Sequence, residues 1–208
     1  METIGLKRNR KEKAHIADCT PEELFEAIVD IIETGEVETL KETIKKFQFY
    51  ETPREVAEYL VELADLQETD QILEPSAWHG AILDCIPKYI NTPRALELDD
   101  KKVEILKWKW YEVFCEDFLL SSIDWVNKII ANPPFSKSQD VKHILKMYET
   151  LSEWGRLVSI ASSSIKTREG KLYDELKALN PEFIELPDWS FKESWTMVNT
   201  VIVVIDKK

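Results

Sequence analysis

A polar tetrapeptide, Asn132-Pro133-Pro134-Phe135, follows directly on the short apolar run Ile129-Ile130-Ala131. The apolar run is typical of a buried strand in a parallel sheet, and the two prolines end it because they donate no N–H and fix φ. An amide, unpaired carbonyls and an aromatic ring then stand at the carboxyl end of a strand, where open α/β sheets bind ligands. This set is able to hold a planar group that carries an amino nitrogen. A strand followed by a proline turn would give the same pattern.

Polar residues also follow three strands predicted earlier in the chain. The connection Glu74-Pro-Ser-Ala-Trp-His-Gly80 lies after the first of them, where such folds cradle a nucleotide-like ligand. Glu97 ends the second, at a place where an acid commonly holds the ribose hydroxyls of an adenosine ligand. Asp117 follows the third and offers an acceptor for an adenine amino group. Four strand ends therefore deliver polar groups to one edge of the predicted sheet.

The elements that position these groups alternate between strand and helix. This alternation predicts an α/β fold with a doubly wound, mostly parallel sheet of seven strands, in which the last strand is antiparallel. The predicted strands are 71–74, 94–99, 111–114, 126–131, 156–161, 183–186 and 199–205. The predicted helices are 52–63, 81–86, 100–106, 139–154 (closed by Gly155) and 171–179. Residues 1–46 are interpreted as a basic arm and helical extension, and 47–208 as the main domain. Four tryptophans fall in segments that we predict to be core or core edge, namely Trp108, Trp110, Trp125 and Trp154.

Composition limits the classes of function. The 208 residues carry a net charge of −12, which argues against a protein that coats nucleic acid unaided. No apolar run approaches the roughly 18 residues that span a bilayer, and the polar, basic N-terminus does not resemble a signal peptide. Three scattered cysteines fit a reducing cytoplasm and provide no metal-binding spacing.

The motifs and their order resemble those of class I S-adenosylmethionine-dependent methyltransferases. More narrowly, they resemble the group that methylates the N6 amino nitrogen of adenine in DNA, and the resemblance covers about residues 47–206. It implies a Rossmann-like catalytic domain at 47–208, S-adenosyl-L-methionine as cofactor and no metal. It also implies that Asn132, Pro133, Pro134 and Phe135 form the catalytic motif. Asn132 and Pro133 would accept the two N–H bonds of the target amino group, and Phe135 would stack on the base.

The resemblance implies further site residues. Those expected near the cofactor are Tyr50, Thr52, Glu74, Ser76, Ala77, Gly80, Glu97, Asp117 and Asn132. Phe191 is expected to stack on the other face of a flipped-out base. Strand-end loops carry Lys137, Lys166 and Arg168, which either face a phosphate backbone or are solvated loop charges.

Two tryptophans depart from the pattern, because Trp78 and Trp195 stand where relatives commonly have small residues. Either the loop reroutes and the Trp78 indole points away, or the pocket is partly filled and the chain is a pseudoenzyme.

Three functions remain open on these residues. The first is a DNA adenine methyltransferase, and the second is a methyltransferase for a guanine amino group in RNA or a glutamine amide in protein. The third is an inactive binding module on the same scaffold. We expect nucleic acid, DNA first, as the substrate. The chain has no room for a target-recognition domain of the usual size, so sequence-specific reading of DNA would come from the helical extension, from loops or from a partner chain that confers specificity.

Overall fold

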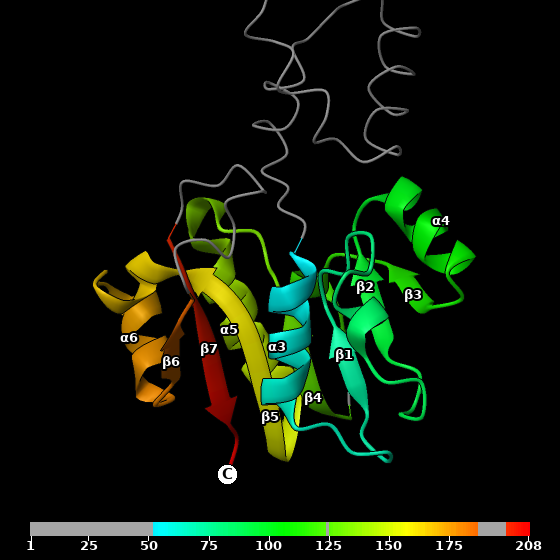
Figure 1. Cartoon of the computed structure of the whole chain (residues 1–208). Coiled ribbons are helices and arrows are strands. Elements are labelled where there is room, and N and C mark those ends of the chain that lie inside the picture. The colour runs from blue at the N-terminus through cyan, green and yellow to red at the C-terminus, as the bar shows by residue number, and fades with distance from the viewer. Residues whose placement is uncertain (1–51, 124, 187–198) are drawn as a thin grey trace, which may run out of the picture. The chain divides into compact units, whose positions relative to one another are not determined.

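The structure, a computed structural model, describes residues 52–123, 125–186 and 199–208. Within these residues, seven strands form one sheet in the order β3-β2-β1-β4-β5-β7-β6 (Figure 1). The strands are β1 (Ile72–Glu74), β2 (Arg94–Glu97), β3 (Glu112–Cys115), β4 (Val126–Ala131), β5 (Leu151–Ser162), β6 (Glu182–Glu185) and β7 (Thr200–Asp206). Strands β1 to β5 pair parallel, whereas β7 pairs antiparallel with both β5 and β6. The predicted seven-stranded sheet with an antiparallel last strand is confirmed.

Helices cover both faces of the sheet. They are α3 (Arg54–Ala64), α4 (Asp100–Trp108), α5 (Gln139–Thr150) and α6 (Lys171–Ala178), with short 3-10 helices η2 (Leu83–Cys85), η3 (Phe118–Leu120), η4 (Ser136–Ser138) and η5 (Ser163–Lys166). Ile129 of β4 packs in the core that α5 and α6 cover, while its neighbour Ile130 packs in the core beneath α3. Because successive strand residues point to opposite faces, the apolar run that ends in Ala131 is buried on both sides, as predicted.

The helix predicted at 139–154 is shorter than expected. Helix α5 ends at Thr150, and β5 begins at Leu151. Gly155 therefore lies inside a strand and does not end a helix. Backbone hydrogen bonds to Lys207, the residue after β7, explain the difference. The Trp154 N–H donates to the Lys207 carbonyl at 2.9 Å, and the Lys207 N–H donates to the Gly155 carbonyl at 2.9 Å. These bonds join residues far apart in sequence, so local periodicity does not reveal them.

The helix predicted at 81–86 is also wrong, since only the 3-10 turn η2 forms there. Pro87 holds the preceding residue Ile86 in extended backbone (ψ 126°), which leaves too few residues for an α-helix after Gly80. None of the helices in the described part of the chain has the length and apolar content that crossing a bilayer requires.

The four tryptophans predicted as core are instead on the surface. Trp108, Trp110, Trp125 and Trp154 are 86%, 91%, 83% and 83% exposed. Three of them have left-handed backbone with φ between 63° and 67°, and Trp108 is the last residue of α4. Aromatic character alone therefore misplaced them.

Candidate active site

The loops that follow β1, β2 and β3 are tied together by hydrogen bonds. The Ala77 N–H donates to the Leu96 carbonyl at 2.9 Å, and the Trp78 N–H donates to Glu97 Oε2 at 2.8 Å. The Glu116 N–H donates to the Glu97 carbonyl at 3.1 Å. Because β1, β2 and β3 run parallel, these contacts join their carboxyl ends at a single edge. The prediction that these strand ends meet is confirmed.

Asn132 stands at the end of β4, where its side chain contacts Thr52. The Asn132 Nδ2 atom donates to Thr52 Oγ1 at 3.0 Å, and Thr52 is only 7% exposed. This bond fixes the plane of the Asn132 amide. The acceptor atom Oδ1 therefore lies on the side of the amide that faces away from Thr52. Pro133 is buried, and the half-buried ring of Phe135 packs against the core beneath α3. The segment is therefore a firmly supported acceptor group at a strand end.

Glu74, the last residue of β1, is a buried acid. It is 2% exposed, and its Oε2 has no hydrogen-bond partner among the described residues. Burial raises the pKa of Glu74 well above its usual value, and the nearby carboxylates of Glu97 and Asp84 raise it further, against a backbone hydrogen bond from Leu83 that lowers it. An unpaired buried oxygen next to other acids favours a positively charged or N–H-bearing ligand.

The loop from Glu74 to Gly80 keeps a tight backbone despite its tryptophan. Gly80 has φ 86°, and a Cβ there would come within 3.0 Å of a Leu106 methyl group and 3.3 Å of the Tyr111 ring. Trp78 also has a positive φ, 48°, which residues other than glycine adopt at a cost in free energy. Ser76 is half-buried and Ala77 is buried in the same loop. Trp78 therefore takes a backbone conformation that suits glycine.

The Trp78 indole lies against the first turn of α4. The ammonium of Lys102 is 4.1 Å from the centre of the indole ring and 2.7 Å from Asp99 Oδ2. Asp99 also caps α4 by accepting from the Lys101 and Lys102 N–H groups. Nothing in the residue pattern pointed to Lys102, a lysine that is only 4% exposed.

The two acids expected to contact adenosine both accept backbone N–H bonds. Glu97 Oε2 accepts from Trp78 and Oε1 accepts from Asp99 at 2.9 Å, so one lone pair of each oxygen is used. Asp117 Oδ1 accepts from the Leu119 N–H at 2.9 Å and caps η3. These bonds fix both carboxylates in place and leave further acceptor capacity on each.

The members of the predicted cationic rim differ in their contacts within the described residues. Lys166 forms an ion pair with Glu185, whereas Arg168 donates from Nη1 to the Tyr173 hydroxyl at 3.1 Å. Lys137 is exposed, with φ 53°. Tyr173 was not among the predicted site residues, because a tyrosine on an amphipathic helix is indistinguishable in sequence from a core residue.

Four predicted features lie outside the described residues. They are Tyr50, Phe191, Trp195 and the extension at 1–46. The domain division at residue 46 stays a prediction for the same reason.

No model of a known protein family matches the chain. A protein of Methanopyrus kandleri assigned as ribosomal RNA small subunit methyltransferase A is 33% identical over 92 residues, which is 41% of this chain and 33% of that protein. The match therefore spans about a third of the relative's length.

Solved structures match over much more of the chain. A protein from Listeria monocytogenes assigned to the class I S-adenosylmethionine-dependent methyltransferases has a TM-score of 0.60, with 14% identity over 75% of this chain and 60% of its own. A protein from Vibrio vulnificus YJ016 assigned as a modification subunit of a type I restriction enzyme has a TM-score of 0.67, with 14% identity over 98% and 51%. The 23S rRNA methyltransferase ErmE has a TM-score of 0.61, with 17% identity over 77% and 70%. The chain therefore has the fold of the class I S-adenosylmethionine-dependent methyltransferases.

Proposed function

We propose that the protein transfers a methyl group from S-adenosyl-L-methionine to an exocyclic amino nitrogen of nucleic acid, namely N6 of adenine, with DNA as the first candidate. The observation that carries the proposal is the Asn132–Thr52 hydrogen bond, which holds an amide acceptor at the carboxyl end of β4. A strand followed by a simple proline turn would not require a buried threonine hydroxyl to fix that amide.

The chemistry needs acceptors, because the lone pair of an adenine amino group is delocalised into the ring. In the proposal, Asn132 Oδ1 and the Pro133 carbonyl accept the two N–H bonds of the amino group. Both acceptors are neutral and fixed, so they orient the nitrogen and favour a tetrahedral shape without removing a proton. Phe135 provides an aromatic surface for the base. When bound, the cofactor supplies a methyl group on a positively charged sulfur.

The acids along the sheet edge fit the proposed cofactor. Glu74 Oε2 is a buried, unpaired acceptor that suits the ammonium of the methionine moiety. The carboxylate of Glu97 is held by two backbone N–H groups and suits the vicinal ribose hydroxyls. Asp117, held by Leu119, suits the adenine amino group.

The kind of nucleic acid that accepts the methyl group is the most specific part of the proposal. A modification subunit of a type I restriction enzyme and an rRNA methyltransferase are both among the similar structures, so both kinds of nucleic acid belong in the test. We also propose that the protein acts in the cytoplasm and that a partner chain supplies target specificity.

Two measurements test the proposal. Isothermal titration with S-adenosylhomocysteine should show binding to both the wild-type protein and Asn132→Ala. Tritiated methyl groups should enter DNase-sensitive material with the wild-type protein, and the variant should lose transfer by at least about a hundredfold. Label in RNA or protein would redirect the proposal to those acceptors. A wild-type protein that shows no heat at millimolar ligand would support the inactive binding module instead.

A further inference from the structure

The chain takes a strained path directly after the Asn132–Phe135 motif. Lys137 and Ser138 have φ values of 53° and 59°, two consecutive left-handed residues of which neither is glycine. Such residues cost free energy and persist only where the surrounding structure holds them. Neighbouring residues must therefore stabilise this segment.

Ser138 is held from α6. Its Oγ lies 2.7 Å from the Tyr173 hydroxyl, and that hydroxyl accepts from Arg168 Nη1 at 3.1 Å. Because the phenolic oxygen accepts from Arg168, its own proton is available for Ser138. The Tyr173 ring packs against the core that α5 and α6 cover, so the hydroxyl has a fixed position. A hydrogen-bonded chain thus runs from Arg168 through Tyr173 to the residue that opens α5.

Arg168 is a rim cation that a neutral partner holds in place. It is exposed, and the bond to Tyr173 uses one of its five N–H donors. By contrast, Lys166 of the rim is paired with Glu185. The backbone carbonyl of Arg168 accepts from Lys177 Nζ at 3.0 Å, which supports the loop from the other side. The guanidinium is therefore an oriented cation with donors to spare.

We propose that Arg168 binds a backbone phosphate of the nucleic-acid strand whose base enters the site, and that Tyr173 is a positioning residue that couples this contact to the segment after Phe135. A planar guanidinium forms paired hydrogen bonds to phosphate, and phosphate contacts set the register of a strand on a protein. A protein glutamine would offer no such group. The inference rests on the proposed function, because it takes nucleic acid as the substrate. The contact between Arg168 and a phosphate would distinguish a nucleic-acid substrate from a protein substrate.

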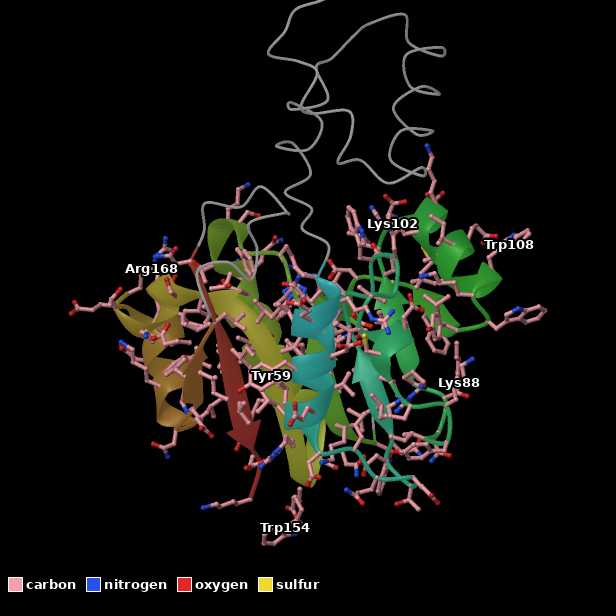
Figure 2. The ribbon with its side chains drawn as sticks, in the orientation of Figure 1. Tyr59, Lys88, Lys102, Trp108, Trp154 and Arg168 are labelled. Atoms are coloured by element: carbon pink, nitrogen blue, oxygen red, sulfur yellow. The ribbon has the colours of Figure 1, made fainter. Side chains whose placement is uncertain are left out.

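Equilibrium binding of fluorescein-labelled single-stranded DNA and RNA 20-mers tests this inference without any methyl transfer. Arg168→Gln should weaken binding about tenfold and lower the slope of log affinity against log salt by about one contact. Tyr173→Phe keeps the ring and removes the hydroxyl, and it should weaken binding several-fold. The double variant should be no weaker than Arg168→Gln alone, because Tyr173 acts through Arg168. Lys88→Gln, an equal charge change on the opposite side of the view from Arg168 (Figure 2), is the control and should bind as the wild type does.

Each outcome separates this inference from the proposed function. Wild-type protein that binds neither oligonucleotide, or an Arg168→Gln variant with unchanged affinity and salt slope, overturns the phosphate contact. Strictly additive effects of the two substitutions overturn the positioning role of Tyr173. If S-adenosylhomocysteine fails to bind while oligonucleotide binding still depends on Arg168, the proposed function fails and the phosphate contact stands.

Discussion

Asn132 and Thr52 are 80 residues apart in sequence, yet the Asn132 amide donates to the Thr52 hydroxyl at 3.0 Å. The residue at the end of β4 is thus oriented by the residue that lies just before Pro53 and α3. The motif follows the fourth strand, whereas the residue that supports it precedes β1, so neither part defines the acceptor alone.

Replacing Thr52 with valine should slow methyl transfer about ten- to hundredfold, because the amide loses the contact that orients it. Thr52→Ser retains a hydroxyl and should keep most of the activity. Single-turnover transfer measures the rate, and titration with S-adenosylhomocysteine shows whether cofactor affinity has changed. A wild-type rate in Thr52→Val would mean that the bond has no role in orienting Asn132.

Glu74 makes the stability of the ligand-free protein depend on pH. Burial raises its pKa in the folded state, so folding takes up a proton at any pH between the ordinary and the raised value. The contribution of Glu74 to stability is therefore greatest below the ordinary glutamate pKa and is lost as pH rises through the raised pKa. Glu74→Gln should be more stable than the wild type at pH 8 and should lose this part of the pH dependence. The variant should also bind S-adenosylhomocysteine about tenfold more weakly. Urea unfolding at pH 5 and pH 8 is the measurement, and parallel pH profiles for the two proteins would contradict the assignment.

The positive φ of Trp78 can be tested with two substitutions that both remove the indole. Trp78→Gly should be more stable than Trp78→Ala by about 1 kcal/mol, because only glycine adopts φ 48° without a steric cost. Both variants lose the contact with Lys102, so their difference isolates the backbone. Urea denaturation gives both free energies of unfolding, and an alanine variant as stable as the glycine variant would exclude the left-handed backbone.

Gly155→Ala should destabilise the fold by about 1–3 kcal/mol. A Cβ there would come within 2.7 Å of the Leu151 side chain and 2.9 Å of the Asn127 carbonyl oxygen. Exposed Glu153, on the same strand, is the control, and Glu153→Ala should change stability by less than about 0.5 kcal/mol. Thermal or urea unfolding distinguishes the two. A neutral Gly155→Ala would contradict the close approach of this position to Leu151 and Asn127.

Much of the sheet could be predicted because the pattern that defines each strand lies within its own residues. Ile129-Ile130-Ala131 is apolar on both faces and is stopped by two prolines, and the observed β4 has the predicted bounds, Val126–Ala131. The carboxyl ends of parallel strands must meet at one edge, which brought Glu74, Glu97 and Asn132 to the same side of the sheet.

The rest depends on partners that are distant in sequence. The first residues of β5 continue the amphipathic pattern of α5, and the Lys207 bonds and the pairing of Leu151 with Val126 reveal them as strand. Tyr173 resembles a core residue until its hydroxyl is seen between Ser138 and Arg168. The Trp78–Lys102 contact likewise needs β1 and β2 side by side before the loop after β1 can reach α4.

The position of β7 has a consequence for the order in which the sheet can be completed during synthesis. β7 is the last of the strands in sequence, yet it lies between β5 and β6 and pairs with both (Figure 1). Until β7 has been synthesised, β5 has an open edge on the side where β7 pairs, and its apolar residues include Leu157, Val158 and Ile160. An open apolar edge invites pairing with other nascent chains. Slow translation between β6 and β7 would therefore prolong the aggregation-prone stage, whereas the first five strands have their mutual partners well before it.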